Sequence, residues 1–145
     1  QRMDLLDVNL WLALADQNHR HHHAAQHYWT NQSHKKIAFC RITALGFLRL
    51  STHPKVLSRP LTTTEAWNAY QNYRDQPGVV FIEDSTALDL EFRRLTQLEK
   101  CTQPLWTDAY LAALAQHRAC RLVSFDADFH TFDGLDFLHL TETQA

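Results

Sequence analysis

The chain has 145 residues, with 14 Lys and Arg against 16 Asp and Glu, and only three glycines and four prolines. Its length is that of one typical domain, and so few glycines exclude flexible linkers, low-complexity tracts and glycine-rich phosphate loops. The net charge of -2 hides an uneven distribution: residues 1–74 carry nine basic and four acidic side chains, and residues 75–145 carry five and twelve, which indicates an anionic partner for the basic part.

Short apolar segments alternate with helical patterns along the first half of the chain. Residues 3–6 are apolar around one Asp and predict a strand, which runs directly into a Leu- and Ala-rich helix over residues 8–15. Next we expect a polar loop over 16–23, a helix over 24–29, a strand over 37–40 and a helix over 42–50.

The same alternation continues in the second half. Thr62 and Glu65 form a capping box, which predicts a helix from there to about Arg74. The remaining predicted strands cover 79–82, 121–125 and 137–140, and the remaining helices cover 88–98 and 105–118. The last helix, with Thr107 as its cap, is apolar around its whole circumference, so we expect it to be buried.

This pattern predicts an α/β fold with a mainly parallel sheet of four or five strands, covered by helices on both faces, because parallel neighbours need helical crossovers. We expect one domain over residues 3–142.

Acidic residues follow two of the predicted strands. Asp7 comes directly after the first strand and Asp126 directly after the fourth. The carboxyl ends of parallel strands meet at one edge of the sheet, so these carboxylates should lie close together if the two strands are neighbours, about 4.8 Å apart. Asp108 lies in the first turn of its helix, which faces the same edge. The sequence therefore predicts three converging carboxylates.

Such a cluster favours a bound cation, because like charges in a partly buried site raise each other's pKa. Oxygen ligands suit Mg2+ or Mn2+, and the chemistry that follows is phosphodiester hydrolysis. Each acid alone also has a structural interpretation: Asp108 would stabilise the helix dipole, and Asp126 would open a turn. Asp7 fits such an interpretation least, because it lies between apolar segments close to the core.

Three segments in this order resemble the signature segments of PIN-domain proteins, most closely the VapC-type toxins of toxin-antitoxin pairs. They are residues 3–9 (MDLLDVN), 106–115 (WTDAYLAALA) and 122–129 (LVSFDADF). The resemblance implies a three-layer α/β/α sandwich and a Mg2+- or Mn2+-dependent endoribonuclease. It also implies a homodimer that a cognate antitoxin protein inhibits.

The resemblance also assigns roles to single residues. Asp7, Asp108 and Asp126 would be the catalytic acids and metal ligands, and Asp128 would assist through water. Asn9 matches a polar position that supports the first acid, and Ser124 a hydroxyl position that orients the site.

One position departs from the family pattern. The family usually places a glutamate on the third helix, where this chain has Gly46. A second hypothesis therefore stays open, a PIN-like module that binds a partner or RNA without cutting it. A third is a phosphatase or phosphotransfer domain with Asp7 as nucleophile; Asn9, in place of the second aspartate of a D-x-D pattern, counts against it.

Other polar and aromatic residues carry less information. Arg41 and Arg49 flank the third predicted helix and would hold RNA phosphates, although Arg49 could equally pair with a structural acid. Histidines at 19 and 21–23 are expected in a solvated loop rather than at a metal. The four tryptophans are expected in the core or at an interface, namely Trp11, Trp29, Trp67 and Trp106.

Cysteine usage and hydropathy indicate the compartment. Cys40, Cys101 and Cys120 form no C-x-x-C pair, so we expect buried thiols in a reducing cytoplasm. No apolar run approaches the roughly 20 residues of a membrane span. We therefore expect a soluble, cytoplasmic protein without a membrane partner.

Overall fold

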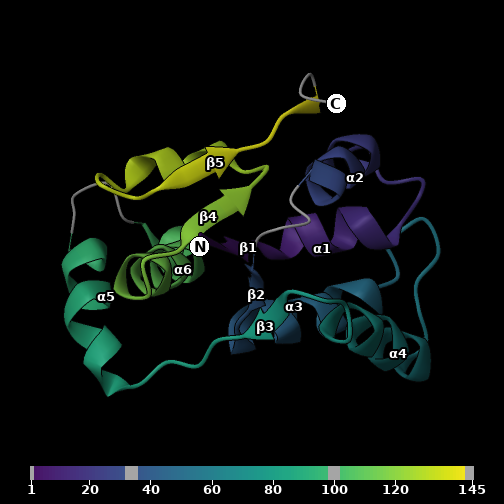
Figure 1. The fold of residues 1–145 in the computed structure, drawn as a ribbon, viewed down its shortest axis with the longest axis horizontal. Helices are drawn as coiled ribbons and strands as arrows, with labels where there is room; N and C mark the ends of the chain where they lie inside the picture. The colour runs from purple at the N-terminus through teal and green to yellow at the C-terminus, as the bar shows by residue number, and fades with distance from the viewer. Residues whose placement is uncertain (1, 32–35, 98–101, 143–145) are drawn as a thin grey trace.

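The computed structural model describes residues 2–31, 36–97 and 102–142. Its strands form one parallel sheet with the order β3-β2-β1-β4-β5 (Figure 1). They are β1 (Met3–Leu6), β2 (Lys36–Phe39), β3 (Val79–Phe81), β4 (Arg121–Ser124) and β5 (Phe137–His139). The first and fourth strands are neighbours, because β1 pairs with β4, so the condition for bringing Asp7 and Asp126 to one place is met.

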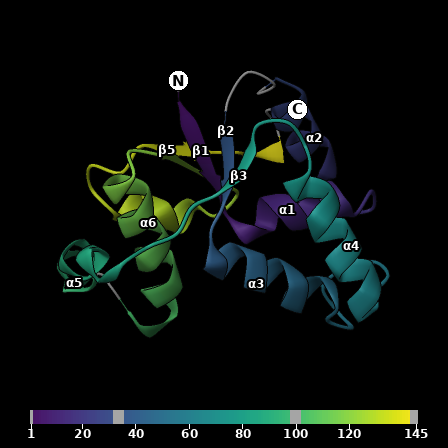
Figure 2. The ribbon, with the colours of Figure 1, turned by 60° about the horizontal axis from the view of Figure 1, so that its bottom comes forward.

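Helices cover both faces of this sheet. In the described residues they are α1 (Val8–Ala15), α2 (His22–Asn31), α3 (Arg41–Ser51), α4 (Thr63–Arg74), α5 (Asp89–Thr96) and α6 (Trp106–His117). Figure 2 shows α5 and α6 on one side of the strands and α1, α3 and α4 on the other. The predicted three-layer α/β/α sandwich is confirmed.

Period-two alternation along the strands creates two separate cores. Leu5 and Leu122 point to one face and pack with the apolar side of α6. Leu6 and Val123, the next residue of each strand, point to the other face and pack with α1 and α3. Successive side chains of a strand alternate between the faces of the sheet. Because helices cover both faces, all four of these side chains are fully buried.

The register of the central strands fixes the start of α1. Leu6 lies opposite Val123, and the Asp7 backbone N–H donates to the Val123 carbonyl oxygen at 2.9 Å. Asp7 then caps α1, because its carboxylate accepts a hydrogen bond from the Val8 N–H. The chain therefore leaves β1 and β4 at the same edge of the sheet.

Some local predictions are wrong. Thr107 does not cap α6: the helix begins at Trp106 after a 3-10 turn over Gln103–Leu105, so Thr107 is its second residue. Helix α2 begins at His22, so His22 and His23 lie in its first turn and not in a loop. Trp11 is fully buried, which agrees with the expectation of a core or interface position, whereas Trp67 and Trp106 are about half exposed, at 53% and 51%, so an interface position stays a prediction for these two.

Two of the cysteines, Cys40 and Cys120, are buried free thiols, as expected, and Cys101 lies outside the described residues. Within the described ranges, no helix combines the length and the apolar character needed to cross a membrane.

Candidate active site

Three carboxylates meet at the carboxyl edge of the sheet. Asp108 comes from the first turn of α6, and Asp126 and Asp128 come from the turn that follows β4. Each offers an oxygen, and these oxygens all lie within 4.8 Å of one another. Asp126 also accepts a hydrogen bond from the Asp128 N–H at 2.9 Å, which holds the two side chains in one turn. Asp128, expected to assist through water, thus lies in this acidic cluster.

Asp7 lies beside the acidic cluster and is held in place by hydrogen bonds. Its side chain is 8% exposed, with one oxygen accepting from the Val8 N–H at 2.7 Å and the other from the Ser124 hydroxyl at 2.7 Å. Burial raises the pKa of Asp7, the two hydrogen bonds oppose that rise, and the charge of Asp126 adds to it. Asp7 is therefore a fixed, electrostatically coupled neighbour of the cluster.

Ser124 connects the strand ends to each other. Its buried hydroxyl donates to Asp7, accepts from the Asn9 side-chain amide at 3.1 Å, and accepts from the Asp126 N–H at 2.9 Å. A hydroxyl can donate once and accept twice, so all of its capacity is used. These contacts link Asp7, Asn9 and Asp126 across β1 and β4.

The acidic cluster is electrostatically strained without a cation. Burial raises the pKa of Asp108 to about 7, and the charges of Asp7, Asp126 and Asp128 add to that rise. A carboxylate needs a compensating positive charge to stay ionised among three others. The oxygen-only donor set and its spacing fit a divalent cation such as Mg2+ or Mn2+.

This shifted pKa predicts how the metal-free protein responds to pH. Asp108 has a usual pKa of 3.8 and a folded-state value of about 7, so between these values the folded state binds the extra proton. Stability in EDTA should then fall as pH rises from about 4 to about 7, because the unfolded state releases this proton in that range while the folded state retains it, so that a higher pH favours unfolding. We expect the melting temperature to fall less steeply in Asp108→Asn, which cannot titrate. If the melting temperatures of the two proteins changed with pH in parallel, the pH dependence of stability would not come from Asp108.

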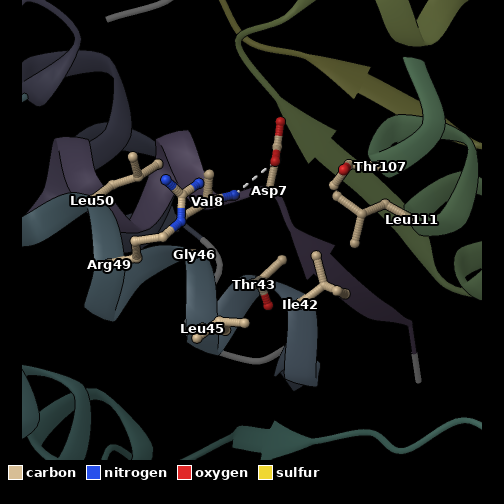
Figure 3. Close-up of a pocket in the computed structure, with 10 residues that line it drawn as sticks. All are labelled: Asp7, Val8, Ile42, Thr43, Leu45, Gly46, Arg49, Leu50, Thr107 and Leu111. Carbon is tan, nitrogen blue, oxygen red and sulfur yellow. Dashed lines mark hydrogen bonds between the residues drawn. The ribbon is translucent and has the colours of Figure 1, made fainter. Parts of the chain in front are cut away.

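A pocket of about 210 Å³ opens next to Asp7. Figure 3 shows it between α3 and α6, with Asp7 between the two helices. Its lining is mostly apolar, and Arg49 adds a positive charge. It is lined by Asp7, Val8, Ile42, Thr43, Leu45, Gly46, Arg49, Leu50, Thr107 and Leu111. The pocket therefore places the positive charge of Arg49 near the acidic edge of the sheet.

The two arginines singled out from the sequence lie in different surroundings. Arg49 lines the Asp7 pocket. Arg41, the first residue of α3, instead places its guanidinium carbon 4.7 Å from the centre of the Phe81 ring and lines a separate pocket.

Gly46 allows α1 and α3 to approach each other closely. A Cβ atom built at this position would lie 3.1 Å from Cγ2 of Val8, so even alanine would press on α1. The glutamate expected here from the family pattern would meet the same side chain. Gly46 and Val8 thus form a matched pair.

A double-mutant cycle tests this pairing. Gly46→Ala should gain helix propensity, worth about 1 kcal/mol, but lose a similar amount through overpacking against Val8. In a Val8→Ala background the overpacking is relieved, so Gly46→Ala should be more favourable there by about 1 kcal/mol. Denaturant unfolding of the four proteins measures this coupling, and additive effects would contradict the contact.

The family of the chain follows from comparison with known proteins. The family model of the PIN domain matches residues 5–135, a range that includes Asp7 and the whole acidic cluster. The chain belongs to the PIN domain family.

Known proteins of the VapC type are similar to this chain in sequence. Ribonuclease VapC41 of Mycobacterium tuberculosis is 36% identical over 140 residues, which cover 92% of this chain and 96% of that protein. Ribonuclease VapC38 of the same species is 35% identical over 130 residues, 89% of each chain. The resemblance to VapC-type proteins is confirmed.

Two solved structures share the fold at low sequence identity. VapBC2 from Rickettsia felis, bound to a DNA fragment from its promoter, matches with a TM-score of 0.72 and 14% identity, over 96% of this chain and 99% of that one. VapC20 of Mycobacterium tuberculosis, a sarcin-ricin loop cleaving toxin, matches with a TM-score of 0.71 and 14% identity, over 92% and 97% of the two chains.

Proposed function

We propose that this protein is a metal-dependent endoribonuclease and the toxin of a VapBC-like toxin-antitoxin pair. The observation that carries the proposal is the convergence of Asp108, Asp126 and Asp128 within 4.8 Å, beside the buried Asp7, at the carboxyl edge of the sheet. The names of the similar proteins, ribonucleases of the VapC type, support the same activity.

The residues that would hold the metal are Asp7, Asp108 and Asp126, with Asp128 as a fourth acid. Mg2+ is the proposed ion and Mn2+ an alternative; when bound, it would activate a water molecule and offset charge on the scissile phosphate. Ser124 fixes Asp7 and the Asp126 backbone, so the acids are positioned before substrate arrives. Arg49, in the Asp7 pocket, would hold an RNA phosphate.

The experiment is cleavage of an end-labelled RNA by the purified protein. We expect cleavage with Mg2+ or Mn2+ and none in EDTA, with activity restored when Mn2+ is added back in excess. Intact RNA in every condition would contradict the nuclease proposal. A melting temperature that also stays unchanged on Mn2+ titration would favour the module that binds without cutting.

We also propose a cognate antitoxin protein as partner, a homodimer and a cytoplasmic location. Expression of this protein alone should arrest bacterial growth. Co-expression of the product of a neighbouring short reading frame should suppress that arrest, and this product should co-purify with the chain. Light scattering should give twice the mass of one chain, and a monomer at micromolar concentration would contradict the dimer.

A further inference from the structure

A second pocket, of about 350 Å³, lies at the carboxyl end of β3. Figure 2 shows the chain after β3 running across to α5, past α6. The pocket combines one guanidinium, one aromatic ring, one phenol and two carboxylates. It is lined by Arg41, Phe81, Ile82, Glu83, Asp84 and Tyr110, and we call it the β3 pocket.

The β3 pocket is adjacent to the Asp7 pocket. Helix α6 contributes Thr107 to the Asp7 pocket and Tyr110, one turn further on, to the β3 pocket. Helix α3 likewise contributes Ile42 to the first and Arg41 to the second. The same two helices therefore border both pockets.

One wall of the β3 pocket is suited to stacking. The Arg41 guanidinium lies over the Phe81 ring at 4.7 Å, and Arg74 contacts the same ring at 5.2 Å. Unstacked bases of single-stranded RNA stack on aromatic rings and on arginine planes. The positive charges also attract the phosphates on either side of such a base.

The β3 pocket also offers a hydrogen-bond acceptor, which Tyr110 holds in a defined orientation. The Tyr110 hydroxyl donates to Oδ2 of Asp84 at 2.7 Å, and among the described residues no hydrogen bond reaches Oδ1 of this exposed carboxylate. Burial, first of all, and the contact with Asp84 raise the pKa of Tyr110, so the phenol keeps its proton at neutral pH. An ionised carboxylate only accepts, so its free oxygen selects a group that donates.

We propose that the β3 pocket binds a nucleobase with an exocyclic amino group, in the RNA strand whose scissile phosphate lies at the acidic cluster. Adenine, cytosine and guanine carry such an amino group and can donate to Asp84. Uracil has a carbonyl oxygen where cytosine has its amino group, and this oxygen repels the carboxylate; the N3–H donor of uracil lies at a different position on the ring edge. This inference rests on the proposed ribonuclease function and adds a base preference to it.

The experiment compares RNA oligonucleotides that differ at one nucleotide. Cytidine is exchanged for uridine, or adenosine for inosine, at each position around the cleaved bond, so that the exocyclic amino group becomes a carbonyl and the adjacent ring nitrogen gains a proton. At one position within a few nucleotides of the cut, we expect kcat/KM to be about 10-fold higher for the amino base, the discrimination of one good contact. Asp84→Asn should abolish or reverse this ratio, because the amide can also donate.

Two further variants separate recognition from folding. Asp89→Asn removes a charge from an exposed acid at the start of α5, outside the pocket, and should leave the ratio unchanged. Arg41→Gln removes the stacking partner and should weaken binding of both oligonucleotides equally. An amino-base preference that is absent in the unmodified protein, or that persists in Asp84→Asn with an unchanged melting temperature, would overturn the proposal.

Binding of the same oligonucleotides without metal, by fluorescence anisotropy, keeps this test independent of cleavage. If RNA is bound with the amino-base preference but never cut, the nuclease proposal fails and the pocket assignment stands. If RNA is cut and neither kcat/KM nor Kd depends on the amino group, the pocket assignment fails alone. If neither cleavage nor base-dependent binding occurs, both are wrong.

Discussion

Replacing Asp126 with asparagine is expected to lower RNA cleavage by about 100-fold or more. Substitutions that only reorient metal ligands already cost about 10- to 100-fold, and this one removes a negative charge from the group that would hold the cation. The fold should survive, because the asparagine side-chain oxygen can still accept the hydrogen bond that Asp126 takes from the Asp128 N–H.

Asp133→Asn provides the matched control, since Asp133 is an exposed acid just after the same turn. Initial cleavage rates in Mn2+ and the rise of melting temperature with Mn2+ should both be reduced by Asp126→Asn and unchanged by Asp133→Asn. If Asp126→Asn cleaved RNA as fast as the control, Asp126 would have only its structural role in the turn.

Replacing Asp4 with asparagine is expected to destabilise the protein by about 3–5 kcal/mol. The Asp4 carboxylate is fully buried and bridges Arg121, at 3.1 and 2.8 Å, and the Tyr28 hydroxyl, at 2.6 Å. The substitution removes the carboxylate that forms the ion pair with the largely buried Arg121 guanidinium. A loss of this size is a large share of the roughly 5–15 kcal/mol that stabilise a typical domain.

The chain contains a matched pair for comparison. Arg94 also contacts Glu91 through two nitrogens, at 3.2 and 2.6 Å, but on the exposed face of α5, with Arg94 55% exposed. Glu91→Gln should therefore cost no more than about 0.5 kcal/mol. Urea unfolding of both variants measures the two losses in free energy of unfolding. Equal losses would mean that burial does not determine the strength of the Asp4–Arg121 ion pair.

The sequence predicted the sheet and the edge at which Asp108 and Asp126 lie, because both depend on local pattern plus one topological rule. Apolar runs marked the strands, and parallel order sends the ends of β1 and β4 to the same edge. The full membership of the acidic cluster was harder to predict. Asp128 joins the cluster through the 3-10 turn that Asp126 caps, and a short polar turn has no hydrophobic period from which its shape could be predicted.

Other features depend on tertiary contacts that periodicity does not encode. Trp67 and Trp106 lie in helices as expected, yet the pattern did not indicate that they would be half exposed. Asp4 did have a signal, a charge inside an apolar strand. Its partner Arg121 could be identified only from the register, in which these two residues lie opposite each other.

The pairing of β1 with β4 also determines when the acidic edge can form. Asp7 and Ser124, joined by a hydrogen bond, are 117 positions apart in the chain, and contacts of such long sequence separation form late because their loop-closure entropy must be overcome first. During synthesis, a nascent chain that ends before β4 has Asp7 but neither Asp126 nor Asp128. The acidic edge can thus form only after the chain has emerged from the ribosome past Asp128.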